Sequence, residues 1–226
     1  MGCNASPSPE RSRRPTTETL CRLLRQNRNS GSLPFQIHIQ MVELDPAAGQ
    51  DQGRMDIAFS PLVPREDVYF SLECKRLNVV NGKRVRAYSR EYVVFGMVRF
   101  IRGQYAAMVR HGGMLGYVLD GNVNRAIQNV GGAIQTHHLD LGMESPGEML
   151  PSSIRPGDSR IRETHHTRQR NVSPFLIHHI LVPSTQVAPL RRENRHKGFS
   201  SASKKKRRPK SARVGTACAV ELAETA

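Results

Sequence analysis

A short β-prone run near the middle of the chain carries two opposite charges, and this feature most constrains the fold. Residues 68–75, VYFSLECK, alternate between apolar and polar side chains with the two-residue period of a β-strand. Glu73 and Lys75 stand two positions apart, so in a strand they point to the same face. Burying either charge alone would cost several kcal/mol. The fold must therefore supply polar partners on this face.

Residues 54–60, RMDIAFS, are expected to pair with this strand as its antiparallel neighbour. When apolar residues are matched in pairs whose numbers sum to 129, Asp56 lies beside Glu73 and shares a face with Lys75. A register shifted by one residue would bury polar groups, whereas a shift of two makes the carboxylates diagonal neighbours and stays open. Because adjacent carboxylates repel, Lys75 and a divalent metal are the cations expected between them.

Hydrophobic periodicity and turn residues predict the remaining elements. Helices are expected at about residues 16–28, 90–110 and 122–135, and strands at 35–44, 54–60, 68–75, 114–120 and 175–182. The polar segments 78–89 and 136–173 are expected to be loops. The order α-β-β-β-α-β, followed by a helix and a strand, predicts an α/β domain with a mixed central sheet flanked by helices.

Net charge is unevenly distributed along the 226 residues, which carry +15 in total. Between residues 191 and 213, eleven Lys or Arg accompany one Glu, so about +10 belongs to this segment. We expect one domain at 16–183 and disordered segments at 1–15 and 184–226, the latter a basic tail. Such a balance favours a polyanion, most directly DNA. The basic residues expected to contact DNA in the tail are Lys204, Lys205, Lys206, Arg207 and Arg208.

Four widely spaced cysteines and the lack of about 20 consecutive apolar residues favour a reduced, cytoplasmic protein with no transmembrane segment. The opening MGCNAS fits a myristoylation pattern and SKKKRRPK fits a nuclear localisation signal. A lipid-anchored eukaryotic protein is therefore one alternative. Both patterns are short, and we interpret the basic run as a tail that adds nonspecific affinity for DNA. Three His doublets are interpreted as ordinary histidines, because neighbouring residues in a strand point to opposite faces.

Asp-x16-Glu-x-Lys in this strand context resembles the PD-(D/E)xK nuclease superfamily, which has a restriction-endonuclease-like core of order α-β-β-β-α-β. The resemblance implies that Asp56 and Glu73 ligate Mg²⁺, with Mn²⁺ as a substitute, and that Lys75 positions or activates the attacking water. Met55 stands where many members have Pro, a position at which the superfamily is lax. The stretches ECKRLNV, EYVVFGMVRFIRGQYA and GGMLGYVLDG are similar to a group of small, uncharacterised bacterial and phage-borne members.

The same resemblance suggests accessory residues. Glu18, in the acidic opening of the first helix, corresponds to an outer metal ligand. Arg99, Gln104 and Tyr105 match an RF…Y pattern and are expected to hold the lysine or a phosphate, since the arginine fork suits phosphate geometry. A homodimer is a further expectation, because duplex cleavage by single active sites often requires two copies.

We therefore expect a Mg²⁺-dependent nuclease that hydrolyses phosphodiester bonds in DNA, with a role in restriction, phage defence or DNA processing. Hard, oxygen-binding Mg²⁺ suits this chemistry. One alternative is a catalytically inactive nucleic-acid-binding or adaptor protein of the same fold. Another is a plain cross-strand salt bridge among Asp56, Glu73 and Lys75 on a solvated sheet face. The sequence leaves open which form of DNA is the substrate.

Overall fold

The computed structural model describes residues 14–183 apart from positions 45, 47, 64, 66, 169 and 170. Side chains are described from residue 17 onward, except at 171–173. The disorder expected at 184–226 lies outside the described residues, and so does the expected N-terminal segment up to residue 13. No helix in the described part of the chain is long and apolar enough to cross a membrane.

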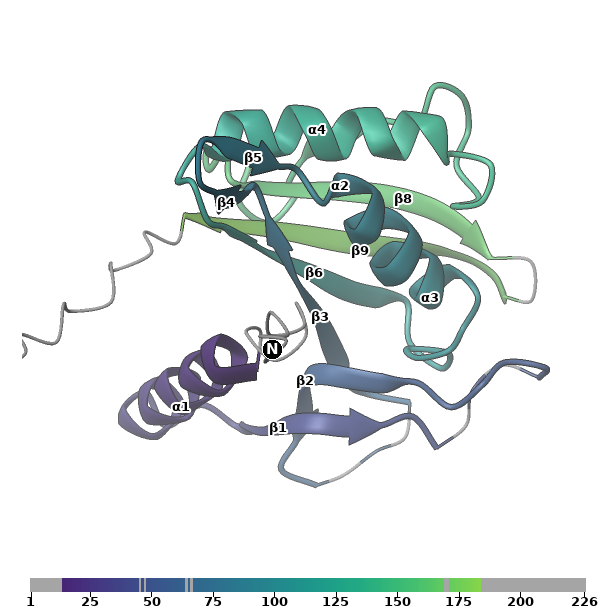
Figure 1. Ribbon diagram of the computed structural model, residues 1–226. Helices are drawn as coiled ribbons and strands as arrows, with labels where there is room; N and C mark the ends of the chain where they lie inside the picture. The colour runs from purple at the N-terminus through teal and green to yellow at the C-terminus, as the bar shows by residue number, and fades with distance from the viewer. Residues whose placement is uncertain are drawn as a thin grey trace, which may run out of the picture. The chain divides into compact units, whose positions relative to one another are not determined.

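A mixed sheet of seven strands forms the centre of the described chain (Figure 1), in the order β1-β2-β3-β6-β9-β8-β7. Strands β3, β6 and β9 run parallel, and the remaining pairs are antiparallel. The mixed α/β class predicted from the element order is therefore confirmed. The strands are β1 (Phe35–Val42), β2 (Arg54–Pro61), β3 (Phe70–Leu77), β6 (His111–Val118), β7 (Leu150–Pro151), β8 (Ile161–Arg168) and β9 (Asn171–Pro183).

Helices cover both faces of this sheet. Helix α1 (Arg14–Ser30) contributes the buried Cys21 to an apolar cluster that includes Ile37 from β1 and Leu115 from β6. The opposite face is covered by α4 (Val123–Thr136) and by one continuous helical stretch. That stretch consists of α2 (Ser89–Tyr92), a π-helical turn η1 (Val93–Met97) and α3 (Val98–Ile101). The layers are thus helix, sheet and helix, and the central strands are buried from both sides.

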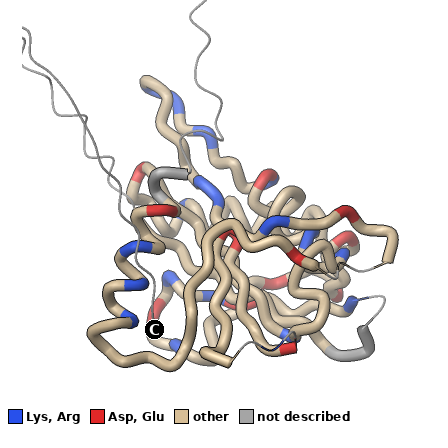
Figure 2. Tube along the Cα trace, turned by 90° about the horizontal axis from the view of Figure 1, so that it is seen from below, with Lys and Arg blue, Asp and Glu red and all other residues tan. Residues whose placement is uncertain are grey.

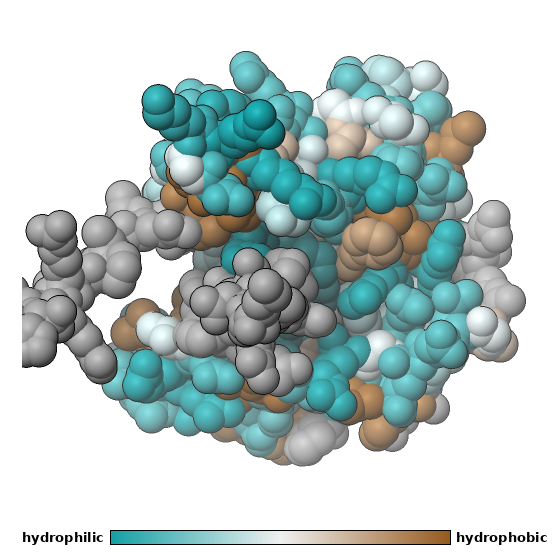
Figure 3. Space-filling model, viewed as in Figure 1, coloured by the Kyte–Doolittle hydropathy of each residue, from teal (hydrophilic) through white to brown (hydrophobic). Residues whose placement is uncertain are grey.

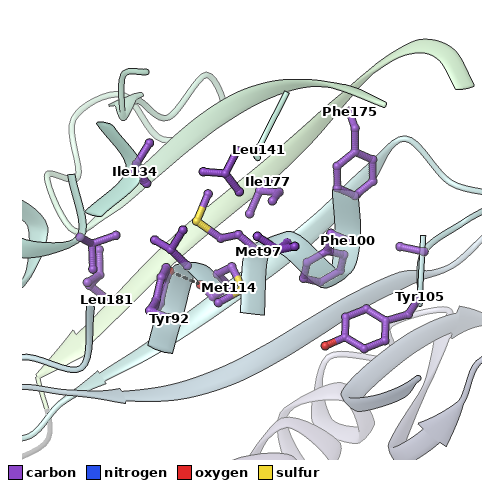
Figure 4. Close-up of a cluster of buried hydrophobic side chains, with 14 of the residues drawn as sticks. Tyr92, Met97, Phe100, Tyr105, Met114, Ile134, Leu141, Phe175, Ile177 and Leu181 are labelled. Atoms are coloured by element: carbon purple, nitrogen blue, oxygen red, sulfur yellow. Dashed lines mark hydrogen bonds between the residues drawn. The ribbon is translucent and has the colours of Figure 1, made fainter. Parts of the chain in front are cut away.

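The second cluster is the larger apolar core (Figure 4). It brings together Tyr92 and Phe100 of the helical stretch, Ile134 of α4 and Phe175 of β9, all with 1% exposure or less. Each fully buried side chain of this size contributes roughly 1.5–3 kcal/mol from removal of apolar surface. This core fixes the helical stretch against β3 and β6.

The predicted pairing of the two middle strands is confirmed over the residues that form a ladder. Ile57 pairs with Leu72, and the two pairs that follow also have numbers that sum to 129. This register was predicted because it matches apolar residues with apolar residues. The alternative register, shifted by two residues, is therefore excluded.

Two expected boundaries are wrong. The helix predicted for 90–110 ends at Ile101, because Gly103 adopts a left-handed φ of 70° and an irregular loop follows. The strand expected at 114–120 begins earlier, at His111, so the two glycines of the HGG sequence lie inside β6. A Cβ at Gly112 would lie 2.7 Å from the Phe100 ring, so glycine allows the helix to approach the strand.

Two segments predicted to be loops contain strands. Residues 78–89 form a hairpin of β4 (Val79–Asn81) and β5 (Arg84–Arg86) around a left-handed Gly82. Within 136–173, β7 and β8 extend the main sheet, and β8 pairs with β9 along most of its length. Strand β8, IRETHHTR, was missed because its buried positions are polar side chains.

Those polar residues form a buried chain of hydrogen bonds. His166 Nδ1 donates to the Leu141 carbonyl at 2.8 Å, so its Nε2 accepts from the Thr164 hydroxyl at 2.7 Å. Thr164 then accepts from His179 Nε2 at 2.9 Å, and His179 Nδ1 accepts from the Tyr92 hydroxyl at 2.9 Å. All four bonds therefore point in one direction only when both histidines are neutral.

The burial of His166 and His179 agrees with their neutral form. It lowers the pKa of His166 to about 4 and that of His179 to about 3, because the charged form would lose its hydration. The neighbouring His178 points to the other face, where it stacks on His111 with a nitrogen–nitrogen distance of 3.1 Å. His166 and His179 thus act as buried hydrogen-bonding residues of the core.

Candidate functional site

Asp56 lies directly beyond the last ladder pair between β2 and β3, which is Ile57 with Leu72. Its Oδ2 accepts a hydrogen bond from the backbone amide of Cys74 at 2.8 Å, and its Oδ1 lies 3.5 Å from Gln40 Nε2. The carboxylate thus takes the place of a backbone carbonyl between the strands. The predicted cross-strand pair of Asp56 with Glu73 is not among the ladder pairs, which end at Ile57.

The same irregularity corrects a predicted face. In a regularly alternating strand Met55 and Ile57 would point to one side, but Met55 joins the core around Phe100 whereas Ile57 joins the cluster beneath α1. On the neighbouring strand, Gln40 has a left-handed φ of 57° between two regular pairs. The alternation of side chains between the two faces of β2 is interrupted at Asp56, whose side chain lies between the strands and binds the Cys74 amide.

Glu73 and Lys75 lie on β3 and are only 3% and 6% exposed. Lys75 Nζ donates to Glu73 Oε1 in a close ion pair. The Tyr105 hydroxyl donates to Glu73 Oε2 at 2.9 Å, and Arg99 Nη1 lies 3.7 Å from Oε1. The polar face predicted for this strand is therefore enclosed, and three donors surround one carboxylate.

The two carboxylates lie close enough to act on the same groups. Burial raises the pKa of the Cys74 thiol, and the charges of Asp56 and Glu73 raise it further. Burial alone would lower the pKa of Arg99, but Tyr105 and both carboxylates outweigh it and the pKa is raised. Tyr105 keeps its proton, since burial and then the charge of Glu73 raise its pKa.

Two glycines make room for these side chains. A Cβ on Gly96, in the π-helical turn, would lie 2.5 Å from Met114 Cε and 3.4 Å from Lys75 Cε. A Cβ on Gly53 would lie 2.3 Å from the Tyr105 ring. Because real Cβ atoms avoid contacts this short, Gly53 is required for Tyr105 to lie where it does. At Gly96 the short contact is with the end of the flexible Met114 side chain, whereas the contact with Lys75 would be an ordinary one.

A second buried group holds the loop that carries Tyr105. Glu43 Oε2 accepts from the Ala106 amide at 3.0 Å and from the Tyr69 hydroxyl at 2.5 Å. Arg168 Nη1 donates to the Ala106 carbonyl at 2.8 Å, and its guanidinium lies 3.5 Å above the Phe175 ring. Sequence reasoning missed these residues, because their contacts span about sixty positions.

Asp56, Glu73 and Lys75 border one cleft of about 1100 Å³. It lies between the first turn of α1, the loop that precedes β2, and the stretch from α2 to α3. Hydrophilic side chains predominate on the face of the molecule seen in Figure 3. The lining includes the acidic residues Glu18, Asp51, Asp56, Glu73 and Glu91 and the basic residues Arg54, Lys75, Arg76 and Arg99.

Most residues predicted to form a site meet here. Asp56, Glu73 and Lys75 line the cleft, as do the exposed Glu18 of α1 and the accessory residues Arg99 and Gln104. Tyr105 is buried behind Glu73 and supports it. The five tail residues from Lys204 to Arg208 lie outside the described residues.

The donor set suits a hard divalent cation better than a transition metal. Among the described residues, no group of three or more His, Cys, Asp or Glu is placed to hold a metal. Mg²⁺ usually keeps several waters and uses one or two carboxylates together with substrate phosphates. Asp56 and Glu73 on one cleft fit that requirement.

Comparisons of this chain with protein-family models, with curated proteins and with solved structures find no match.

Proposed function

We propose that this protein is a Mg²⁺-dependent nuclease of the PD-(D/E)xK type, with a restriction-endonuclease-like core, that hydrolyses phosphodiester bonds in DNA. The observation that carries the proposal is the meeting of Asp56, Glu73 and Lys75 on one cleft. Two carboxylates and a lysine are the groups that metal-assisted attack of water on phosphate requires. The basic composition of the chain suits a polyanionic substrate.

In this proposal, Asp56 and Glu73 hold Mg²⁺ or Mn²⁺, and Glu18 is an accessory ligand. When bound, the cation supplies charge stabilisation at the phosphate and lowers the pKa of a coordinated water. The bond from the Cys74 amide orients Asp56, and the hydroxyl of Tyr105 orients Glu73. Such supporting hydrogen bonds hold carboxylates in the orientation that a ligand needs.

Lys75 is assigned to the attacking water. Its aliphatic chain lies beside Gly96, and its ammonium group is held within the cleft by Glu73. From this position it orients the water and neutralises charge on the phosphate. Arg99, partly exposed and close to both carboxylates, is placed to contact a phosphate oxygen.

The rival function is a catalytically inactive DNA-binding or adaptor protein. It is favoured by one observation, that both oxygens of Glu73 already have donors within the protein. A purely structural buried ion pair is, however, often no more stable than apolar residues of similar size. A charged network enclosed at the wall of a cleft is better explained by a role in the cleft.

The test is incubation of plasmid and linear DNA with the protein in Mg²⁺, Mn²⁺ or EDTA. The wild type is expected to cut with either metal and not in EDTA. Lys75→Ala is expected to abolish cutting while far-ultraviolet circular dichroism and DNA binding remain near wild type. Cleavage by Lys75→Ala at the wild-type rate would refute the assignment, and a wild type that binds but never cuts would favour the inactive rival.

A further inference from the structure

The hairpin of β4 and β5 projects from the end of β3 and packs little of its own surface. The valines of its centre, Val80 and Val85, are 42% and 41% exposed. Lys83, Arg84 and Arg86 are also exposed. Figure 2 shows this hairpin leaving the body of the molecule with Lys and Arg along it. Its basic surface is therefore available to a partner.

The base of the hairpin is fixed. Asn78, fully buried, joins β3 to β4 with a left-handed φ of 50°, and its amide donates to the Ala87 carbonyl at 3.1 Å. Its side-chain nitrogen donates to Asp120 Oδ1 at 3.0 Å and to the Asn122 carbonyl at 3.3 Å. Because these bonds tie the hairpin to the loop before α4, its direction is set by the fold and little entropy remains to be lost on binding.

The arginines lie on the side of the hairpin that faces the cleft. Residues that pair directly across two strands share a face, and Arg86 pairs with Val79 whereas Arg84 pairs with Asn81. Arg86 Nη2 binds Glu91 Oε1 at 2.7 Å. Its guanidinium also lies 4.2 Å above the ring of Tyr88, and both Tyr88 and Glu91 line the cleft. Arg84, two positions earlier, shares this face, and the two valines face the other way.

We propose that this hairpin contacts duplex DNA beside the scissile phosphate, with Lys83 and Arg84 on backbone phosphates. The inference rests on the proposed nuclease function, which brings the duplex to the cleft. A two-stranded ribbon fits the major groove of B-DNA. Gly82 lies seven residues beyond Lys75, a reach of up to roughly 23 Å at about 3.3 Å per residue, or about seven base pairs. Double-stranded DNA is thus the substrate class that the hairpin selects.

Binding in EDTA tests this inference separately from cleavage. A labelled duplex and a single strand of equal length are titrated with the full chain over a range of KCl concentrations. Lys83→Ala/Arg84→Ala is expected to weaken duplex binding and to reduce the slope of log K against log salt by about 1.8, or about 0.9 per phosphate contact. Arg110→Ala/Arg155→Ala removes two exposed charges that do not line the cleft, and is expected to change the slope by less than half as much.

Equal effects of the two double variants would overturn the inference, and so would an equal loss of single-strand binding in the hairpin variant. Either result leaves the nuclease proposal untouched, since that proposal depends on metal-dependent cutting and on Lys75. A hairpin variant that loses duplex binding, in a protein that never cuts, would support the hairpin contact while refuting the nuclease. Circular dichroism of each variant verifies that the fold is retained.

Discussion

Lowering the pH below neutral should destabilise this protein through its buried histidines. His166 and His179 are neutral in the fold, because both are buried and burial lowers the pKa of each. Their pKa values, about 4 and about 3, lie below the value of 6.5 for a free histidine. The unfolded chain therefore binds more protons than the folded chain once the pH falls toward 6.5, so stability decreases with falling pH through this range.

The expected loss follows from these values. Each pKa unit corresponds to about 1.4 kcal/mol. Between about pH 7.5 and pH 5, each histidine takes up a proton in the unfolded state only, which lowers the free energy of unfolding by about 2 kcal/mol per group and about 4 kcal/mol for both. This is a large part of the roughly 5–15 kcal/mol that stabilises a typical domain. Asp158 and Glu163, with pKa values of about 2 in the fold, add little in this range, because carboxyl groups of the unfolded chain take up protons mainly below about pH 5.

Urea denaturation of the full chain across this pH range measures the effect. His166→Gln is expected to reduce the pH dependence by about half. His165→Gln, at the partly exposed neighbouring position, removes a bond to Glu163 and should change it much less. A free energy of unfolding that stays constant from neutral pH to pH 5 would refute the neutral, one-directional chain. Equal effects of the two variants would show that the dependence comes from elsewhere.

Two other predictions concern the support of the site and helix α4. Tyr105→Phe removes the hydrogen bond to Glu73 and is expected to lower metal-dependent cleavage by roughly 10- to 100-fold. Tyr69→Phe removes a tyrosine–glutamate bond that does not touch Glu73, to the Glu43 that holds the Tyr105 loop, and should lower stability much more than cleavage per folded molecule. Plasmid assays and urea denaturation of both variants separate these outcomes, and equal cleavage loss would contradict the role of Tyr105. At Gly131 and Gly132 of α4 there is open space for a Cβ, so Gly131→Ala and Gly132→Ala should each raise the free energy of unfolding by about 0.5–1 kcal/mol. A lower free energy of unfolding in urea would contradict the open space at these positions.

The pairing of the central strands could be predicted from the sequence because only one register keeps apolar residues together. Ile57 opposite Leu72 follows from that rule, and the closeness of Asp56 to Glu73 follows from the register. Periodicity also predicted α4, whose buried residues recur at helical spacing. These elements depend on local patterns and nearest strand neighbours.

Other features depend on contacts that no local pattern reports. Most of strand β8 is polar, and its burial is explained by partners such as the Leu141 carbonyl and His179, which come from other segments. Tyr105 was predicted as a helical residue near the lysine, yet it lies in a loop held by Glu43 and Arg168. The enclosure of Lys75 likewise involves Gly96, which lies beside its side chain in a different element. Sequence reasoning therefore predicted that the candidate residues lie near one another better than it predicted their surroundings.

The most direct test of the nuclease proposal compares the cleavage rates of two variants, each of which neutralises one carboxylate of the same cleft. Asp56 is assigned to the metal, whereas Asp51 lines the cleft, is exposed and has no assigned role. Metal-dependent cutting of plasmid DNA is compared for Asp56→Asn and Asp51→Asn, purified in parallel with the wild type. Asp56→Asn should lose at least about 100-fold in rate, and Asp51→Asn should remain close to wild type. Equal rates for the two variants would contradict the assignment of Asp56 and, with it, the metal site.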